Sequence, residues 1–155
     1  MVSIIETNSY DKSIFTLWQE AFGDTEEDIK FFIDNCRHKS VLTLFDDNKL
    51  CAMLFLVDTA VNDAEYKYIY AACTFKQCRG RGYMSALLKY AVNAYKNVLL
   101  IPADDELVRY YKKRNFNKII EINNIEFNEC DEIKEYLFEG CSLDKPFALA
   151  FVKGE

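Results

Sequence analysis

The spacing of apolar residues predicts two helices near the start of the chain. Over residues 11–22 apolar side chains recur every three or four positions, and Gly23 follows as a helix stop. A second helix is expected after Asp24 or Thr25, because either residue can cap it and acids occupy the next positions, where the helix dipole favours negative charge. The preceding stretch, residues 1–8, is expected to form an edge strand.

Apolar, β-prone runs then predict a hairpin and a long central strand. Residues 41–45 and 50–57 form two such runs, and the polar stretch 46–49 between them is typical of a hairpin turn. A further turn at 62–64 leads into a strand over 65–75. These segments therefore predict a largely antiparallel start to the sheet.

The central strand is expected to carry a row of tyrosines on one face. Strict alternation of side chains places five residues on that face, namely Tyr66, Tyr68, Tyr70, Ala72 and Thr74. Such a row fits cross-strand packing and the lining of a substrate pocket equally well.

Helices and short apolar strands alternate over the rest of the chain. The pattern predicts helices at 84–96, 106–114 and 131–138, and strands at 97–101, 116–127 and 147–152. Asp104 or Asp105 is expected to cap the middle helix, and Asn115 to end it in left-handed backbone. Because a strand–helix–strand unit of this length implies a right-handed parallel crossover, we expect an α/β or α+β fold with three layers.

Composition and charge narrow the class of protein. At 155 residues, of which 50% are hydrophobic and 15% aromatic, the chain is long enough for one domain over residues 1–155 with a substantial core. No apolar run approaches the roughly 20 residues of a membrane-spanning helix, and the N-terminus lacks the features of a secretory signal. The formal charge of −6 argues against a nucleic-acid partner. We therefore expect a cytoplasmic protein without membrane contacts.

The cysteines and the single histidine do not suggest metal or triad chemistry. None of the six cysteines forms a C-x-x-C pair, so they are expected to be reduced, with Cys51 and Cys73 buried in strands. His38 has no paired ligand spacing around it and is expected to be a surface residue at a helix end. We therefore expect no metal site and no histidine-based nucleophilic triad.

The stretch with the clearest chemistry is the basic glycine loop at residues 76–85. An apolar strand precedes it and a helix follows, so unpaired backbone amides at the helix start can bind phosphate. Gly80 and Gly82 allow a ligand to approach the main chain. Within an acidic chain this segment carries only cations, Lys76, Arg79 and Arg81. This pattern is consistent with a loop that binds pyrophosphate. It is also consistent with an ordinary helix N-terminus whose arginines are exposed to solvent.

Two segments together resemble the GNAT superfamily of acetyl-CoA-dependent N-acetyltransferases. Residues 77–82 match that family's Q/R-x-x-G-x-G/A loop, and residues 111–116 resemble its Y-x-x-x-G-F segment, with Asn115 in place of the glycine. The resemblance covers residues 40–127. It implies a GNAT-like three-layer fold, with a mixed, mostly antiparallel central sheet, a parallel crossover at the cofactor loop and helices on both faces.

The resemblance implies acetyl-CoA as co-substrate, with no metal. Backbone amides from Arg79 to Ser85 would bind its pyrophosphate, and the strand end at 72–74 would pair with the pantetheine arm. Asp104 stands where many members have an asparagine that bonds this arm. The cofactor-binding residues expected on this basis are Ala72, Cys73, Thr74, Gln77, Arg79, Gly80, Arg81, Gly82, Tyr83, Met84, Ser85 and Asp104.

The resemblance also implies direct attack of a primary amine on the thioester. Tyr111 matches the family's general acid, and Glu65, at the start of the central strand, is the first candidate for the base that takes the amine proton. The candidates for contact with a small-molecule or peptide amine are aromatic residues, together with the acids of residues 24–28, which would suit a cationic amine. The aromatic candidates are Phe31, which lies off the buried stripe of its helix, and Tyr66, Tyr68 and Tyr70.

Alternatives to this assignment remain open in the sequence. One is a non-catalytic module that keeps the fold and binds acyl-CoA. A less favoured one is a dinucleotide-binding domain, because residues 80–85 approach a G-x-G-x-x-G/A pattern and Asp104 follows about 20 residues later. The acceptor's identity, and whether the protein is a monomer or a homodimer, are not decided by the sequence.

Overall fold

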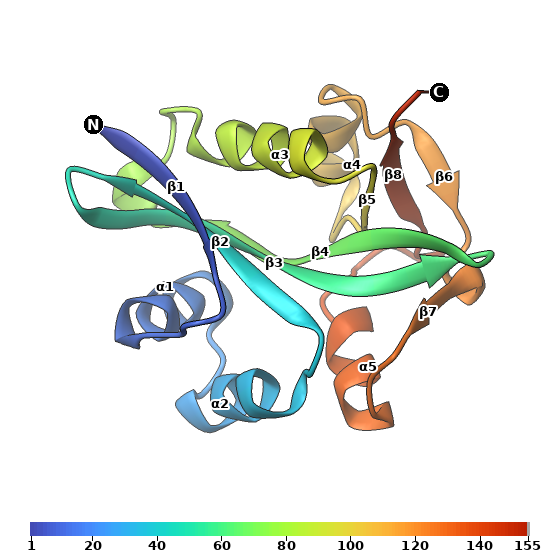
Figure 1. The fold of residues 1–155 in the computed structure, drawn as a ribbon, viewed down its shortest axis with the longest axis horizontal. Coiled ribbons are helices and arrows are strands. Elements are labelled where there is room, and N and C mark those ends of the chain that lie inside the picture. The colour runs from blue at the N-terminus through green and yellow to red at the C-terminus, as the bar shows by residue number, and fades with distance from the viewer. Residues whose placement is uncertain (155) are drawn as a thin grey trace.

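A twisted sheet with helices on both faces organises the computed structural model, which describes residues 1–154 (Figure 1). The described strands are β1 (Val2–Thr7), β2 (Lys39–Asp46), β3 (Lys49–Val61), β4 (Ala64–Thr74), β5 (Asn97–Leu100), β6 (Lys118–Ile120), β7 (Ile125–Phe127) and β8 (Ala148–Val152). The described α-helices are α1 (Lys12–Phe22), α2 (Glu26–Asn35), α3 (Tyr83–Ala94), α4 (Asp105–Lys112) and α5 (Asp131–Phe138). None of these helices is long and apolar enough to cross a membrane.

The sheet confirms the expected mixed, mostly antiparallel architecture. Its strand order is β1-β2-β3-β4-β5-β8-β6, with β7 paired to β3 beside this path. The pair β4–β5 is parallel and is connected through α3, whereas the other described pairs are antiparallel. One parallel pair does not make a doubly wound sheet, so the fold departs from the dinucleotide-binding alternative.

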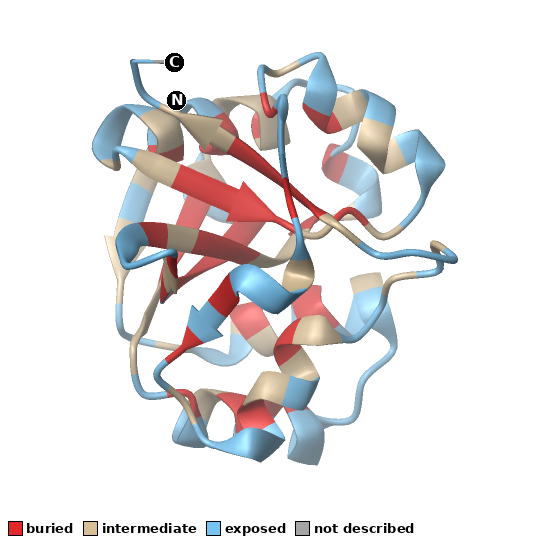
Figure 2. Cartoon of the chain, turned by 90° about the vertical axis from the view of Figure 1, so that its right-hand side faces the viewer, coloured by how far each residue is buried: buried red, intermediate tan, exposed pale blue. Residues whose placement is uncertain are grey.

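Two hydrophobic cores fill the spaces on either side of the sheet. Helices α1, α2 and α5 cover one face, where Trp18, Phe32 and Phe55 pack together. Helix α3, with α4 beside it, covers the other face, where Leu87 and Phe116 are fully buried. In Figure 2 the buried stretches run through the central strands, and exposed segments form the outer faces of the helices. The burial of apolar side chains on both faces stabilises the packing of the helices on the sheet.

Most of the turns and helix caps that the sequence predicts are confirmed by the structure. The hairpin turn at residues 47–48 and the turn at 62–63 have positive φ values of 50–68°, as tight two-residue hairpins require. Thr25 rather than Asp24 caps α2, because its hydroxyl accepts the Asp28 amide at 3.1 Å. Asn115 ends α4 with φ 70°, as expected.

Two expectations about strands were wrong. Residues 116–127 form two strands rather than one, because a 3-10 turn at 122–124 sends β6 to pair with β8 and β7 to pair with β3. In β4 the alternation of faces breaks at Ala71, whose φ of 53° marks a bulge. Beyond the bulge Cys73, and not Ala72, shares the core of the tyrosine face.

Candidate active site

Strands β4 and β5 separate shortly after they begin to pair. Their parallel ladder contains two residue pairs, Lys67 with Val98 and Tyr68 with Leu99. Beyond these pairs β4 continues to Thr74, past the bulge at Ala71, without β5 beside it. The separation therefore leaves one edge of β4 open to an extended ligand.

A cavity of about 360 Å³ lies at this separation. Its lining comes from α1 and the loop after it, from β4, from the end of β5, from α4 and from the segment after α5. The lining residues are Trp18, Phe22, Asp24, Tyr68, Ile69, Tyr70, Ala71, Ala72, Leu100, Ile101, Ala103, Leu107, Tyr111, Glu139 and Gly140. The cavity is mostly apolar with a few polar groups, which is typical of a small-molecule site.

Tyr111 projects from α4 into this cavity. Its side chain is 8% exposed, and its ring packs edge-on against Tyr110 and Phe116, with centroid distances of 5.2 and 6.0 Å. Within residues 1–154 its hydroxyl makes no hydrogen bond. Burial raises the pKa of this phenol, so the group is a proton donor at neutral pH. A residue with an unpaired, protonated hydroxyl therefore lines the cavity where β4 and β5 separate.

The glycine loop presents a run of unpaired backbone amides. Within the described chain the N–H groups of residues 80–85 donate to no acceptor, and the ladder of α3 begins with the Ala86 amide donating to Gly82. Gly80 and Gly82 have φ values of 81° and 76°, and open space lies where a Cβ would stand. The amide of Arg79 is engaged by the Lys76 carbonyl at 3.3 Å, so the free run begins one residue later than expected.

Several side chains of the loop are hydrogen-bonded to groups outside it or are exposed to solvent. The Tyr83 hydroxyl donates to the Asp46 carboxylate, and this bond lowers the pKa of Asp46. Arg79 donates through Nε to the Thr74 carbonyl at 3.4 Å. Arg81 and Gln77 are exposed. Tyr83 can therefore serve a phosphate only through its amide, whereas the exposed cations contribute charge.

Arg114 joins the end of α4 to the start of α3, which sequence reasoning missed. Its Nε donates to Ser85 Oγ at 2.9 Å, and its guanidinium lies 3.5 Å from the centre of the Tyr110 ring. Arg114 is the last of three consecutive basic residues, and the other two, Lys112 and Lys113, are exposed. Nothing in that run indicated which cation turns inward.

Asp104 is used by its own helix. Its Oδ1 accepts the Leu107 amide at 2.8 Å and so caps α4. Its neighbour Ala103, and not Asp104, lines the cavity. The expected role of Asp104 toward the pantetheine arm stays a prediction.

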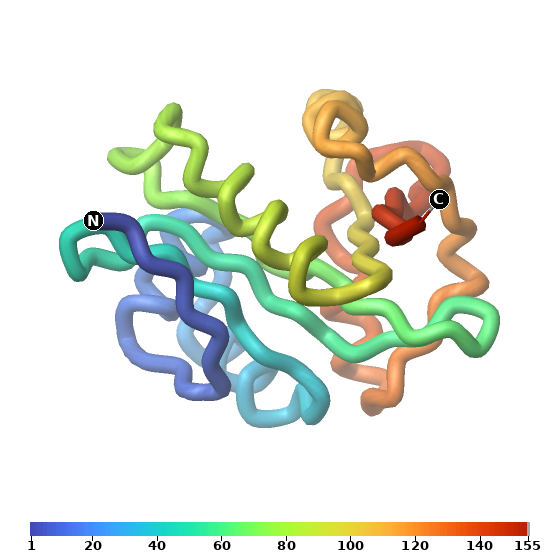
Figure 3. Tube along the Cα trace, turned by 45° about the horizontal axis from the view of Figure 1, so that its top comes forward, coloured from blue at the N-terminus to red at the C-terminus, as the bar shows by residue number. Residues whose placement is uncertain are grey.

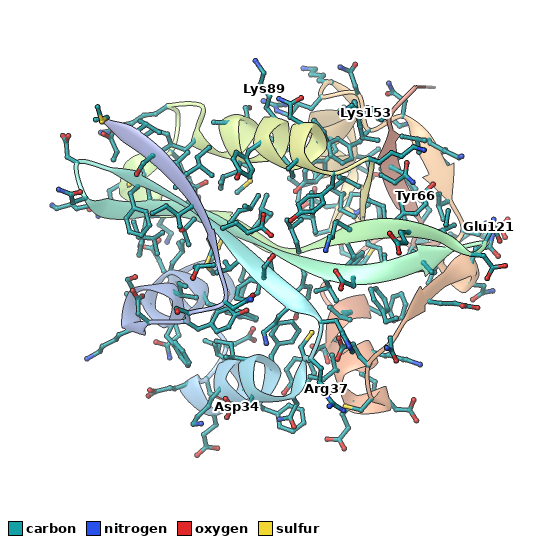
Figure 4. The ribbon with its side chains drawn as sticks, in the orientation of Figure 1. Asp34, Arg37, Tyr66, Lys89, Glu121 and Lys153 are labelled. Carbon is teal, nitrogen blue, oxygen red and sulfur yellow. The ribbon has the colours of Figure 1, made fainter. Side chains whose placement is uncertain are left out.

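The remaining candidates do not all meet at the cavity. Tyr68 and Tyr70 line it, but Glu65 and Tyr66 line a separate pocket near the β3–β4 hairpin. Figure 4 shows Tyr66 on the half of β4 that leads toward that hairpin. Phe31 packs on Tyr136 of α5 at 5.7 Å between ring centres and is not part of the cavity lining. The structure therefore does not bring Glu65 together with Tyr111.

Two carboxylates that sequence reasoning did not assign individually line the same cavity as Tyr111. Asp24, which follows α1, accepts the indole N–H of buried Trp18 at 2.8 Å. Glu139, which follows α5, is exposed, and its side chain makes no hydrogen bond within the described residues. They come from segments 115 residues apart, so no local signal in the sequence could pair them.

Comparison with protein families gives one match that covers most of the chain. A family model described as an acetyltransferase (GNAT) domain matches residues 5–119. No curated protein sequence matches the chain.

Several solved structures share the fold. An acyl-CoA N-acyltransferase from Pseudomonas aeruginosa superposes with a TM-score of 0.64 and 16% identity, over 97% of this chain and 99% of that one. A GNAT family acetyltransferase from Elizabethkingia anophelis with acetyl-CoA bound gives 0.61 and 13%, over 97% of each chain. A conserved protein from Enterococcus faecalis, described as a probable N-acyltransferase, gives 0.56 and 21% over 72% of this chain. This chain spans 32% of the length of that Enterococcus chain.

Proposed function

The chain belongs to the GNAT acetyltransferase family, and we propose that it transfers an acetyl group from acetyl-CoA to a primary amine by direct attack. The family and the fold support acyl transfer from a coenzyme A thioester. The choice of an amine acceptor and the roles of individual residues rest on the geometry of the cavity.

The observation that carries the proposal is the junction of three features at one end of β4. The unpaired amides of residues 80–85 suit a diphosphate, because they combine free N–H donors with the positive end of a helix dipole. Figure 3 shows this loop beside the end of β4, with α3 running from the loop across the near side of the sheet. The open edge of β4 suits an extended arm, and Tyr111 lines the cavity that would receive the thioester at the tip of this arm.

Proton transfer follows from the groups in the cavity. An alkylammonium ion with a pKa near ~10 must first lose a proton, and Glu139 replaces Glu65 as the acceptor because Glu139 lines the cavity. Glu139 passes this proton to the solvent. The neutral nitrogen bonds to the carbonyl carbon, the C–S bond breaks, and the nitrogen loses its second proton to the solvent. Tyr111 donates a proton to the leaving sulfur and recovers one from the solvent, so each transfer releases one proton overall.

Direct attack fits the state of the neighbouring cysteine better than an acyl-enzyme does. Cys73 lies on β4 close to the cavity, but burial raises the pKa of its thiol to about 12. The thiolate is the nucleophilic form of cysteine, and a thiol in this state is almost entirely protonated at neutral pH. The amine is therefore the nucleophile that attacks the thioester.

The test compares Gly82→Asp with Gly82→Asn. Both side chains tolerate the left-handed backbone and have the same shape, so they differ in one negative charge beside the expected diphosphate. By calorimetry, Gly82→Asn is expected to bind acetyl-CoA at least about tenfold more tightly than Gly82→Asp. Equal affinities, or no binding by the parent protein, would remove the phosphate assignment.

Turnover is measured separately, as free thiol released from acetyl-CoA in the presence of a pool of primary amines. Binding with amine-dependent thiol release supports the transferase. Binding without release identifies the non-catalytic acyl-CoA module instead.

A further inference from the structure

The acceptor end of the cavity has a charge pattern that points to a particular class of amine. Building on the proposed function, we propose that the acceptor is an aliphatic diamine, with Asp24 holding the ammonium group that does not react. Asp24 is thus a specificity-determining residue.

The lining carries negative charge without a cation to balance it. Asp24 and Glu139 are its acids, and no lysine, arginine or histidine is among the lining residues of the described chain. With Glu139 free to take the proton of the reacting nitrogen, the second carboxylate is left for another positive group. A diamine supplies one cation to each carboxylate.

A hydrogen bond from Trp18 fixes the carboxylate of Asp24 in position for binding a cation. The indole N–H of Trp18 bonds to its Oδ2 at 2.8 Å, and Trp18 is itself buried at 2% exposure. The Trp18 ring in turn packs edge-on against Tyr70, 5.8 Å between centres. A carboxylate fixed by a buried partner loses little side-chain freedom when it binds a cation.

The field of these acids extends over the aromatic rings beside them. The pKa of Tyr70 is raised mainly by burial, and then by the charges of Asp24 and Glu139. The pKa of Tyr136, which is on α5 outside the cavity lining, is raised by burial and then by the charges of Asp28, Glu139 and Asp24. The Tyr70 ring and both carboxylates line the same cavity, and this combination suits the methylene chain and the charges of an aliphatic diamine.

Tyr111 marks the reacting end independently of the acids. Tyr111 is 8% exposed, its hydroxyl makes no hydrogen bond within the described residues, and it lines the same cavity. An acceptor therefore has its reacting nitrogen near Tyr111 and its remainder along the acidic wall. A carboxylate in place of the second ammonium would meet Asp24 without a compensating cation, which disfavours amino acids as acceptors.

Three acceptors of equal chain length test the proposal. These are 1,4-diaminobutane, 1-aminobutane and 4-aminobutanoate, which differ in carrying a positive, a neutral or a negative far end. With acetyl-CoA saturating, kcat/KM is expected to be at least about fivefold higher for the diamine than for 1-aminobutane, and lowest for 4-aminobutanoate.

The matched variants are Asp24→Asn and Glu27→Gln. Both remove one negative charge near the start of α2, but Glu27 is outside the cavity lining, and Asn at 24 keeps an oxygen for the Trp18 bond. Asp24→Asn is expected to bring the preference for the diamine over 1-aminobutane close to one. Glu27→Gln is expected to leave that preference as in the parent protein.

The outcomes separate this inference from the proposed function. If acetyl-CoA binds and 1-aminobutane is acetylated as well as the diamine, or Asp24→Asn keeps the preference, the diamine assignment is overturned and the transferase stands. If acetyl-CoA binds and none of the three amines is acetylated, the diamine assignment is also overturned. If acetyl-CoA does not bind, both fail. Should Asp24→Asn not fold, the parent protein's order of acceptors decides alone.

Discussion

At the scale of single residues, Tyr111 is where the structure and the proposed chemistry meet most directly. Tyr111→Phe is expected to lower kcat on the order of 10²-fold, because a positioned general acid contributes about that much. Acetyl-CoA affinity is expected to stay unchanged, because the phenol makes no bond within the described chain. Steady-state kinetics and calorimetry measure the two quantities. Tyr110→Phe, next to it on α4, is the control, and equal turnover by Tyr111→Phe and the control would exclude Tyr111 from the reaction.

The pH dependence of this residue follows from its burial. A raised pKa means that the hydroxyl keeps its proton past the ordinary tyrosine value of about 10, and loses it only as the pH rises through the higher value. The ratio of parent to Tyr111→Phe kcat is therefore expected to stay constant between pH 7 and about pH 10. A ratio that falls within this range would indicate that Tyr111 ionises there and would contradict the assignment.

The sequence predicted site residues where a local motif fixes them, and missed those that depend on distant segments. Gly80, Gly82 and Tyr111 belong to short patterns whose spacing is visible in the chain. Asp24 was only one of several acids at 24–28, and its place beside Glu139 in one cavity lining depends on the packing of α1 and α5 on the sheet, which no spacing encodes. Glu65 was a reasonable candidate on its strand, but the length of β4 takes it to the other end of the sheet.

At the scale of elements, Asp104 tests whether a side chain serves its helix or a ligand. Asp104→Ala is expected to lower the free energy of unfolding by ~1 kcal/mol, the usual contribution of a helix cap. Its acetyl-CoA affinity is expected to change by less than about twofold, because Asp104 is outside the cavity lining. Urea denaturation and calorimetry give the two values. Asp105→Ala removes the same charge from the same turn without the cap, and a loss of affinity in Asp104→Ala alone would assign the carboxylate to the ligand.

The boundaries of helices and strands could be predicted from the sequence wherever a capping residue or a glycine marks them. Helices α1, α2 and α5 lie close to their predicted positions, because apolar spacing and capping agree there. The split between β6 and β7 was not visible, since both halves are apolar and their partners, β8 and β3, lie far away in sequence. The bulge at Ala71 was hidden for a similar reason, because alanine does not signal left-handed backbone.

At the scale of the whole molecule, Glu129 links two segments that are distant in sequence, one after β7 and one after α2. Its buried carboxylate accepts the amides of Arg37 and His38 at 2.7 and 2.9 Å, so the segment after β7 is tied to the segment after α2. Glu129→Gln is expected to lower the free energy of unfolding on the order of 2 kcal/mol, because the charge-assisted bonds of a buried carboxylate are weakened. Urea unfolding measures the change. Glu126→Gln, exposed on β7, is the control, and equal stability of the two variants would contradict this role.

The overall architecture was predictable from the order and length of elements, but the sheet order was not. The crossover through α3 required a parallel pair, which β4 and β5 form. The insertion of β8 between β5 and β6 joins strands distant in sequence, and hydrophobic patterning alone does not choose among such partners. This pairing places β8 on the edge of β5 that faces away from β4 and the cavity.

The short ladder between β4 and β5 also bears on how the protein would respond to metabolic conditions. Under the proposed function, acetyl transfer leaves the spent coenzyme with the same diphosphate and the same extended arm, so the gap holds product and substrate through common groups. As free coenzyme A accumulates, it therefore occupies the site in competition with acetyl-CoA and lowers the rate of turnover. The rate would follow the ratio of acetylated to free coenzyme rather than the amount of either, and the protein would slow whenever the supply of acetyl groups falls.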